Sequence, residues 1–326
     1  MIVVTGGAGF IGSAVVSRLN ELGHEKIVIV DRLGTSEKWK NLNGLSFSEI
    51  FHKDEFYNWL IEERVPFNIN AVIHLGACSS TTEKDSDYLV QNNLRYSQEL
   101  VKYCLPRKAR FIYASSAATY GDGSLGYNDN EDELEKLRPL NMYGYSKHLF
   151  DIWLKKMKIS NKVVGIKYFN VYGPNEFHKA DMRSVVHKAF GQILETGKVK
   201  LFKSYHEDYG DGEQMRDFVY VKDAVNMTLS FLENLDKNGL YNVGSGKARS
   251  WNDLVTSLFN AMNKPVNIEY IDMPEELRGK YQYFTEANLD KIRGVGYSEK
   301  THSLEEGITD YVQNYLMKNM FLGLSK

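Results

Sequence analysis

Three side chains in the middle of the chain have the types and spacing needed to oxidise an alcohol. Tyr143 and Lys147 stand four residues apart in the segment MYGYSKHLF, and on a helix this spacing places both side chains on one face. A free tyrosine, with a pKa of about 10, is a poor base near neutral pH, but neighbouring positive charge favours its phenolate. The phenolate could accept a hydroxyl proton, while the hydroxyl of Ser116 steadies the charge on the same substrate oxygen.

The first twelve residues, MIVVTGGAGFIG, have the pattern of a phosphate-binding loop. Ile2–Val4 form a β-branched run that suits a buried parallel strand, and Gly6, Gly9 and Gly12 follow at three-residue intervals. The first glycine permits the turn, the second lets backbone amides approach a pyrophosphate, and the third lets the next helix pack closely on the sheet. The pyrophosphate is expected at the positive end of that helix.

The residues after the glycines favour a dinucleotide site over a purely structural tight turn. Ser13–Leu22 reads as an amphipathic helix, and Ile27–Val30 as a second apolar strand that ends in Asp31. A positive nicotinamide ring would add to the effect of Lys147 on the tyrosine pKa, so that hydride and proton leave one carbon together. Without this loop, an ordinary pair on a helix surface would be the better interpretation of Tyr143 and Lys147.

Strands and helices alternate from the start of the chain to about residue 170, which predicts an α/β fold with a doubly wound parallel sheet of the Rossmann type. Further apolar strands are expected at 71–75, 111–114 and 163–168, and a helix at 88–104. Small and polar residues follow these strands, at 76–80, 115–116 and 170–174. In such sheets, ligands bind at the carboxyl ends of the strands, so these clusters are candidate binding residues.

The chain is long enough for two lobes. The dinucleotide-binding domain is expected at 1–170, with returns near 217–246 and 284–297. A second, smaller and discontinuous α/β lobe is expected to close over the cofactor, built from 171–216, 247–283 and 298–326. Within these ranges, a helix is expected at 224–235 and a strand at 241–246. The charged segment 129–138 is expected to be a solvated, mobile face.

The composition argues against nucleic acid and membrane partners. The 326 residues include 40 basic and 42 acidic side chains, for a formal net charge of -2, and no basic run is visible. Cys78 and Cys104 are too few for a disulfide framework or a thiolate metal site, and no metal site is expected. The first strand starts at Met1, and no apolar run approaches the roughly 18 residues of a membrane span, so we expect a cytoplasmic protein.

The glycine loop TGGAGFIG, Ser116, and Tyr143 with Lys147 together resemble the extended short-chain dehydrogenase/reductase family, whose members act mainly on nucleotide sugars. Longer segments over nearly the whole chain narrow the resemblance to the epimerases of ADP-linked heptose. These segments are GACSSTTE at 76–83, YASSAATYG at 113–121, YGYSK at 143–147, YFNVYGP at 168–174, HK at 178–179 and RDFVYV at 216–221.

The resemblance implies an isomerase that converts ADP-D-glycero-β-D-manno-heptose to ADP-L-glycero-β-D-manno-heptose, a precursor of the lipopolysaccharide core. A tightly held nicotinamide cofactor would oxidise the C6 hydroxyl, and the same hydride would return to the opposite face. The family usually uses NADP. Asp31 by itself suggests NAD, since a carboxylate prefers ribose hydroxyls, whereas Arg32, Lys38 and Lys53 offer charge to a 2′-phosphate. A homo-oligomer, with a pentamer as the expected form, is also implied.

Inversion at C6 suggests acid/base groups in two places, and the resemblance assigns these to Tyr143 and Lys179, with Ser116 and Lys147 completing the catalytic set. A lysine in a loop is usually only solvated, and Lys179 serves as a base only if burial or positive charge lowers its pKa. The implied cofactor-binding residues are Gly6, Gly9, Phe10, Ile11, Gly12, Asp31, Arg32, Lys38, Lys53, Leu75, Gly76, Ala77, Cys78, Ser79, Asn92, Lys147, Val171 and Lys179.

The resemblance also implies a set of substrate-binding residues: Asn170, Asp181, Lys188, Phe202, Lys203, Ser204, Tyr205, Arg216 and Tyr281. Among them, Arg216 is the best candidate for the ADP pyrophosphate, because a guanidinium matches two phosphate oxygens. The alternative for Arg216 is a salt bridge with Asp217.

Two other functions stay open. Another nucleotide-sugar epimerase, such as a 4-epimerase, fits the same lobe; a dehydratase is less favoured, because Ser115, Ala117 and Ala118 flank Ser116 where that reaction needs acidic groups. A regulator that binds the cofactor without chemistry would fit the glycine loop. Such proteins commonly lack the tyrosine and lysine pair that this chain has.

Overall fold

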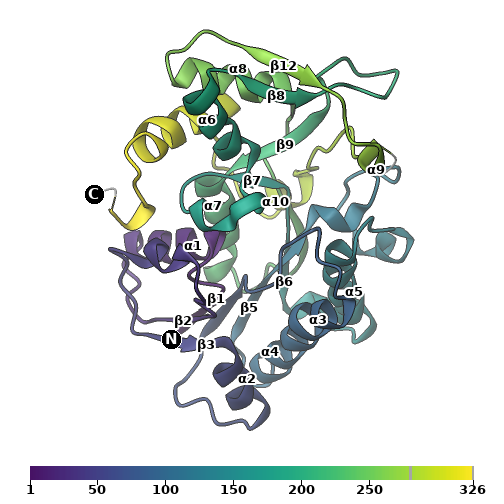
Figure 1. Ribbon diagram of the computed structural model, residues 1–326. Coiled ribbons are helices and arrows are strands. Elements are labelled where there is room, and N and C mark those ends of the chain that lie inside the picture. The colour runs from purple at the N-terminus through teal and green to yellow at the C-terminus, as the bar shows by residue number, and fades with distance from the viewer. Residues whose placement is uncertain (279–280, 325–326) are drawn as a thin grey trace.

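A seven-stranded parallel sheet forms the centre of the computed structural model, which describes residues 1–278 and 281–324 (Figure 1). Its order is β10-β6-β5-β4-β1-β2-β3, and every neighbouring pair is parallel. The strands are β1 (Ile2–Thr5), β2 (Ile27–Asp31), β3 (Glu49–His52), β4 (Ala71–His74), β5 (Arg110–Ser116), β6 (Val164–Tyr168) and β10 (Gly239–Val243). This sheet confirms the predicted α/β class.

Helices cover both faces of the sheet. They are α1 (Phe10–Glu21) and α7 (Val221–Glu233) on one face, and α2 (Lys53–Ile61), α4 (Tyr96–Cys104) and α5 (Met142–Lys156) on the other. Successive residues of β1 point to opposite faces, so Val4 packs in the core with α1 and α7, whereas Val3 packs in the core with α2, α4 and α5. Both residues are fully buried, as expected for a parallel sheet covered on two sides.

A second group of elements lies beyond one end of the sheet, at the top of Figure 1. It contains a three-stranded sheet, in which β9 pairs parallel with β7 and antiparallel with β11, and a parallel pair of β8 and β12. The strands are β7 (Asn170–Tyr172), β8 (Val199–Phe202), β9 (Met215–Tyr220), β11 (Ala248–Ser250) and β12 (Ile268–Ile271). The helices of this group are α6 (Val185–Thr196), α8 (Trp251–Ala261) and α11 (Leu304–Asp310). Of the short helices, α3 (Ser86–Leu89) lies against α5, α10 (Asp290–Gly294) lies against β10, and α9 (Glu275–Arg278) follows β12 in the chain.

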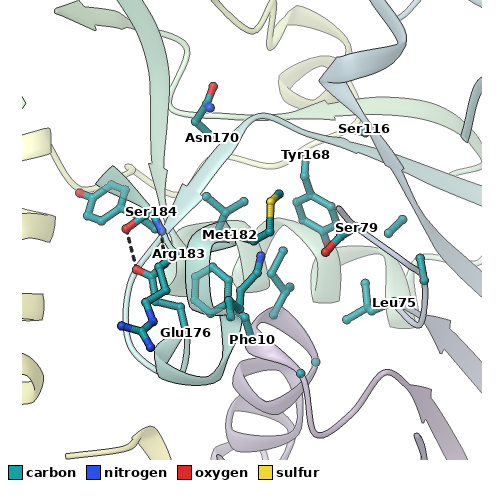
Figure 2. A pocket seen from close by; sticks show the side chains of 18 of the residues that line it. Phe10, Leu75, Ser79, Ser116, Tyr168, Asn170, Glu176, Met182, Arg183 and Ser184 are labelled. Atoms are coloured by element: carbon teal, nitrogen blue, oxygen red, sulfur yellow. Dashed lines mark hydrogen bonds between the residues drawn. The ribbon is translucent and has the colours of Figure 1, made fainter. Parts of the chain in front are cut away.

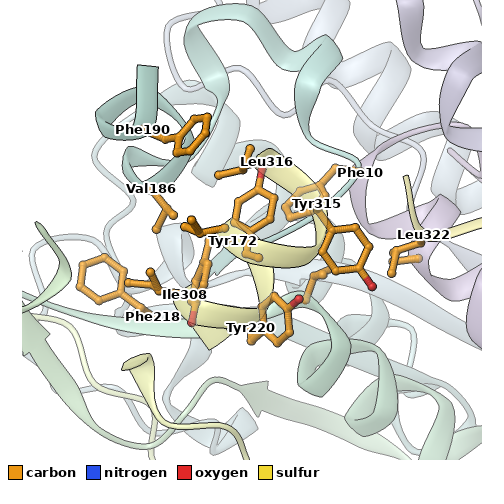
Figure 3. Close-up of a cluster of buried hydrophobic side chains, with 14 of the residues drawn as sticks. Phe10, Tyr172, Val186, Phe190, Phe218, Tyr220, Ile308, Tyr315, Leu316 and Leu322 are labelled. Atoms are coloured by element: carbon orange, nitrogen blue, oxygen red, sulfur yellow. The ribbon is translucent and has the colours of Figure 1, made fainter. Parts of the chain in front are cut away.

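One apolar core joins the two groups of elements (Figure 3). Phe10 of α1 belongs to the same buried cluster as Tyr172 of β7, Val186 and Phe190 of α6, and Ile308 of α11. The burial of these side chains holds the second group against the sheet through the hydrophobic effect. The ranges predicted for the second lobe include 279–280 and 325–326, which lie outside the described residues, and the division into two domains stays a prediction.

The helix predicted at 88–104 is interrupted. It consists of α3, a π-helical turn at Val90–Arg95 and α4. Asn93 lies in that turn, where its amide accepts a hydrogen bond from Cys78 N (2.9 Å) and donates to Cys78 O (3.0 Å) and Ser146 Oγ (3.0 Å). A π-helical turn contains one residue more than an α-helical turn, and here the wider turn directs the buried side-chain amide of Asn93 toward the loop after β4.

The segment 129–138 was expected to be a solvated, mobile face, and most of its charged side chains are exposed, but the segment is also anchored in the core. It contains a 3₁₀ turn at Glu131–Lys136, and Leu134 and Leu137 are buried in the core. Asp129 is buried as well, and accepts a hydrogen bond from Asn242 N on β10 (2.8 Å). The two leucines and one paired carboxylate hold the segment to the protein. Among the described helices, none is long and apolar enough to cross a membrane.

Candidate active site

The glycine loop packs tightly between β1 and the segment after β4. Gly6 has φ +68°, and a Cβ there would lie 2.7 Å from Gly76 N, while a Cβ on Gly12 would collide with the carbonyl oxygen of Gly6. Gly9 is the N-cap of α1 and supplies no side-chain cap, and no acidic residue occupies the first turn of the helix. The amides at this positive helix end are therefore suited to an anionic diphosphate.

Asp31 ends β2 beside the glycine loop and is already well paired. Its carboxylate accepts hydrogen bonds from Ala8 N (3.0 Å) and Arg32 N (2.7 Å), and forms an ion pair with Lys38 (2.6 Å). Arg32, Lys53 and Asn92, together with Asp31 and Lys38, line a small cavity of about 140 Å³ that adjoins the main cleft. Three basic side chains thus surround one acidic residue at the place where an adenosine ribose is expected.

Ser116, Tyr143 and Lys147 come together at the carboxyl end of β5. α5 begins at Met142, after Asn141, whose side chain caps it by accepting a hydrogen bond from Gly144 N (2.8 Å). Tyr143 therefore lies in the first turn of the helix, with Lys147 one turn later, as the spacing of the two residues predicted. Lys147 Nζ donates to Ala114 O of β5 (2.8 Å), and its side chain is buried.

Burial dominates the ionisation of this group. It raises the pKa of Tyr143, although a hydrogen bond with Ser116 opposes the shift. It lowers the pKa of Lys147 to about 8, although the nearby Asp151 carboxylate opposes this. The expected lowering of the tyrosine pKa by Lys147 is not seen, because desolvation outweighs it and the ammonium hydrogen-bonds to Ala114.

Asp151 supports this group from behind, one helical turn after Lys147. Its carboxylate accepts hydrogen bonds from Ser115 Oγ (2.6 Å) and Tyr113 OH (2.9 Å), and pairs with the buried ammonium of Lys167 (3.4 Å). All of these side chains are buried. The network fixes the end of β5 against α5, and therefore the position of Ser116 relative to Lys147.

Lys179 enters the same cleft from a different element. It lies on a 3₁₀ segment, Phe177–Met182, and its ammonium is 5.6 Å from the ring centre of Phe10 in the first turn of α1. Burial lowers the pKa of Lys179, and the Glu176 carboxylate opposes that shift. Lys179 can serve as a base only with a lowered pKa, and desolvation lowers it.

The main cleft has a volume of about 510 Å³ and brings most of the candidates together (Figure 2). Tyr143, Lys147, Ser116 and Lys179 all line it. The cofactor and substrate candidates that also line it are Gly6, Gly9, Phe10, Ile11, Gly12, Asp31, Lys38, Leu75, Gly76, Ala77, Ser79, Asn170 and Val171. Cys78 is half-buried next to this set, with its backbone bound by Asn93.

Arg216 does not pair with Asp217, so that alternative is wrong. Asp217 is buried and accepts hydrogen bonds from the amides of Ser245, Gly246 and Ala287. The guanidinium of Arg216 instead lies 5.2 Å from the ring centre of Tyr281 and 5.8 Å from that of Trp251, a residue that lines the cleft. Tyr281 OH accepts a hydrogen bond from Trp251 Nε1 (2.9 Å), which joins Tyr281 to the same corner.

Of the substrate candidates, only Asn170 lines the cleft; Arg216, Tyr281 and the others lie outside its lining. Asp181 and Lys188 are exposed. Phe202 ends β8, Lys203 pairs with Asp272 (3.2 Å), and Tyr205 OH donates to the same carboxylate (3.0 Å). Ser204 N donates to Asp211 (2.8 Å) within the long loop that follows β8. Residues 202–205 thus lie at the end of β8, whereas Asp181 lies on the Phe177–Met182 segment and Lys188 on α6; the role of all of them in binding stays a prediction.

Sequence reasoning missed several residues that line the cleft, among them Glu176, His178, Arg183, Ser184 and Trp251. Glu176 is buried and accepts hydrogen bonds from the backbone and the hydroxyl of Ser184, the N-cap of α6 (Figure 2). A serine before the apolar pair Val185 and Val186 is a helix-start signal that could have located this edge. No local pattern marks Trp251, because its position depends on tertiary contacts.

The family model described as NAD dependent epimerase/dehydratase family matches residues 2–244. The chain belongs to this family. A relative from Nitratidesulfovibrio vulgaris (strain DP4), named ADP-L-glycero-D-manno-heptose-6-epimerase, is 56% identical over 97% of this chain and 98% of its own length. The family places the chain among enzymes. The relative confirms the prediction of an epimerase, and an epimerase is an isomerase.

Solved structures in the family agree. The ADP-L-glycero-D-manno-heptose-6-epimerase of Helicobacter pylori has a TM-score of 0.80 and 32% identity, covering 95% of this chain and 94% of that one. The UDP-glucuronic acid 4-epimerase of Bacillus cereus, in complex with NAD, has a TM-score of 0.74 and 27% identity, covering 96% and 98%. A nicotinamide cofactor, predicted from the glycine loop, is therefore supported by the family to which the chain belongs.

Proposed function

We propose that this protein inverts C6 of the heptose in ADP-D-glycero-β-D-manno-heptose, giving ADP-L-glycero-β-D-manno-heptose. The observation that carries the proposal is that two separate acid/base candidates, Tyr143 on α5 and Lys179 on the Phe177–Met182 segment, line one cleft with the glycine loop. Inversion removes a proton from the hydroxyl oxygen and returns one after the opposite face of the carbon is presented, and two groups on different elements can serve the two positions of that oxygen. The names of the relatives support the choice of sugar.

The residues of the chain have distinct tasks in this reaction. When bound, a nicotinamide cofactor supplies the oxidation and re-reduction of C6. Tyr143 takes or returns the proton of the C6 hydroxyl on one face, and Ser116 donates a hydrogen bond to the same oxygen. Lys147, one helical turn after Tyr143, lines the same cleft and offers its ammonium to the cofactor. Lys179 handles the proton on the other face, where its lowered pKa brings a lysine closer to neutral pH.

NADP is the cofactor that we propose, with NAD as the alternative. The ion pair with Lys38 neutralises Asp31, which weakens the repulsion of a 2′-phosphate by that carboxylate. Arg32 and Lys53 line the same small cavity and offer further positive charge. The neighbours solved with NAD support the alternative.

The substrate would lie between the catalytic group and Trp251, the lining residue beside which Arg216 lies. We assign the ADP pyrophosphate to Arg216 and the sugar end to Asn170, which lines the cleft next to Val171. Tyr281 stacks against Arg216, and Phe202–Tyr205, Asp181 and Lys188 complete the proposed binding set. Use of the product in lipopolysaccharide core synthesis, action in the cytoplasm and assembly into a homo-oligomer, with a pentamer as the form to test first, belong to the same proposal.

The proposal is tested by giving the purified protein ADP-D-glycero-β-D-manno-heptose or UDP-glucose in separate reactions. NMR of the first reaction should report inversion at C6, and chromatography of the second should report no new hexose. Denaturation of the same preparation and analysis of the released nucleotide should yield NADP. Conversion of UDP-glucose alone would favour a 4-epimerase, and cofactor release without turnover of either sugar would favour the regulator.

A further inference from the structure

The segment that carries Lys179 is not held by regular secondary structure. Phe177–Met182 is a short 3₁₀ segment, and Ala180 inside it has φ 46° and ψ −123°, a conformation that a residue with a Cβ rarely adopts. Such strained residues persist where the surrounding structure fixes the backbone. The contacts that hold this segment therefore decide where the Lys179 ammonium lies.

Asn41 makes the contacts that tie this segment to the glycine loop. It lies in the 3₁₀ segment Glu37–Leu42 and is 1% exposed. Its side-chain nitrogen donates to Ala8 O in the glycine loop (3.0 Å) and to Asn175 O (3.0 Å), and lies 3.2 Å from His178 Nδ1. Carbonyl oxygens only accept hydrogen bonds, so the two of them fix the orientation of the amide.

The same 3₁₀ segment also touches the proposed cofactor site. Lys38, three residues before Asn41, forms the ion pair with Asp31 at the ribose end of the cleft. Lys38 and Asn41 of this segment therefore contact three parts of the site: Lys38 pairs at the ribose end, and Asn41 joins the glycine loop to Asn175 and His178, just before Lys179. No other side-chain amide in the described residues donates to both Ala8 and Asn175.

We propose that Asn41 is a positioning residue, which sets the location of Lys179 relative to the glycine loop by bridging Ala8 O, Asn175 O and the ring of His178. The inference rests on the proposed function, because it takes Lys179 as the second acid/base group. Asn41 itself faces two carbonyl groups and a ring nitrogen, and it acts on the reaction through Lys179. A displacement of a reacting group by about 1 Å can cost about 10²-fold in rate.

The test compares Asn41→Leu with Asn43→Leu. Leucine has a similar size but no donor, and Asn43 is an exposed residue at the end of the same 3₁₀ segment. In Asn41→Leu, kcat for C6 inversion should fall by about 10 to 10²-fold, while the KM for the sugar nucleotide and the nucleotide content of the purified protein stay within threefold. Asn43→Leu should match the wild type. If Asn41→Leu does not fold, Asn41→Ser, which keeps one donor, should show a smaller loss of kcat of the same kind.

A second measurement reads Lys179 without any turnover. Trace acetylation of the purified protein over a pH series, followed by peptide mass spectrometry, gives the titration of each lysine. Lys179 should titrate below the ordinary value of a lysine, about 10.4, in the wild type and move toward that value in Asn41→Leu, but not in Asn43→Leu. An unchanged kcat, or an unchanged Lys179 titration, in folded Asn41→Leu would overturn the inference. If the wild type leaves ADP-heptose unconverted, the proposed function fails, and the acetylation series still decides the role of Asn41.

Discussion

Tyr143 and Lys179 line one cleft but rest on different kinds of support. Tyr143 lies in the first turn of a 15-residue helix, capped by Asn141 and packed against β5 of the central sheet. Lys179 lies on a six-residue 3₁₀ segment with a strained alanine next to it. Repeated backbone hydrogen bonds position the first residue, whereas a few buried side chains position the second.

The comparison predicts where the site is sensitive to change. On the Tyr143 side, a lost side-chain contact leaves the helix and the sheet in place. On the Lys179 side, Asn41 and Glu176 make polar contacts on the two flanks of the segment Phe177–Met182, at Asn175 and Ser184, so that the loss of one of these contacts should displace the ammonium. Substitutions outside the reacting group should therefore reduce the rate more strongly on the Lys179 side.

The largest effects are expected from removal of each acid/base group itself. Tyr143→Phe and Lys179→Met should each lower kcat for C6 inversion by about 10³-fold, because each removes one proton-transfer group. The stabilities should differ. Tyr143→Phe should leave the midpoint of thermal unfolding nearly unchanged, whereas Lys179→Met should raise it, since a buried ammonium is costly to desolvate. NMR of the product and calorimetry measure the two quantities; equal kcat for either variant and the wild type would contradict the two-group scheme.

A smaller effect is expected from the end of β5. Ser116→Ala should lower kcat by about 10²-fold, because it removes one donor to the oxygen that changes charge. The neighbouring Ser115 is the matched control, since its hydroxyl donates to Asp151 behind the site. Ser115→Ala should keep kcat within about threefold and lower the free energy of unfolding by about 1 kcal/mol. Reversed outcomes for the two serines in steady-state kinetics would show that the roles are exchanged.

The two supports also differ in how well the sequence predicts them. The parallel sheet, α1 and the grouping of Ser116, Tyr143 and Lys147 follow from local patterns: apolar runs, glycine spacing and an i,i+4 pair. Lys179 was found only through the resemblance to a family, because no periodic pattern surrounds it. Its neighbours Glu176 and His178 were missed for the same reason.

Tertiary contacts explain the remaining differences. Leu134 and Leu137 are buried although their segment is highly charged. The hydrophobic effect favours their burial, and most charged side chains of the segment stay solvated at the surface, so that the two leucines are buried without desolvating them. Arg216 and Asp217 are adjacent in the sequence but point to different partners, since neighbouring residues of a strand face opposite sides. Neither outcome is encoded within a short window of sequence.

A tenfold effect is expected at Glu176, which supports the Lys179 side. Its carboxylate accepts hydrogen bonds from Ser184 N, Ser184 Oγ and Tyr311 OH, so Glu176→Gln places an amide donor among donors. The free energy of unfolding should fall by about 2 kcal/mol, and kcat by about tenfold as the segment shifts. Urea unfolding and steady-state kinetics measure both. Glu195→Gln, at an exposed position near the end of α6, is the control and should change neither quantity. If Glu176→Gln loses stability but keeps its full kcat, the position of Lys179 does not depend on the hydrogen bonds of Glu176.

The smallest effect on kcat/KM at neutral pH is expected from the titration of Lys147. A pH series also separates the role of Lys147 on α5 most sharply from that of Lys179. Burial lowers the pKa of Lys147 to about 8, so its ammonium is lost as the pH rises through about 8, and kcat/KM should fall above that value. Because the pKa of Lys147 in the folded protein lies below the ordinary value of about 10.4, the free energy of unfolding should increase as the pH rises from about 8 to about 10. Lys147→Arg, which stays protonated, should move the decline to higher pH, and Lys179→Met should keep it at lower overall activity. If the decline in kcat/KM disappears in Lys179→Met and persists in Lys147→Arg, the titration of Lys179 causes it. The charge of Lys147 on α5 would then not be the one that limits the reaction.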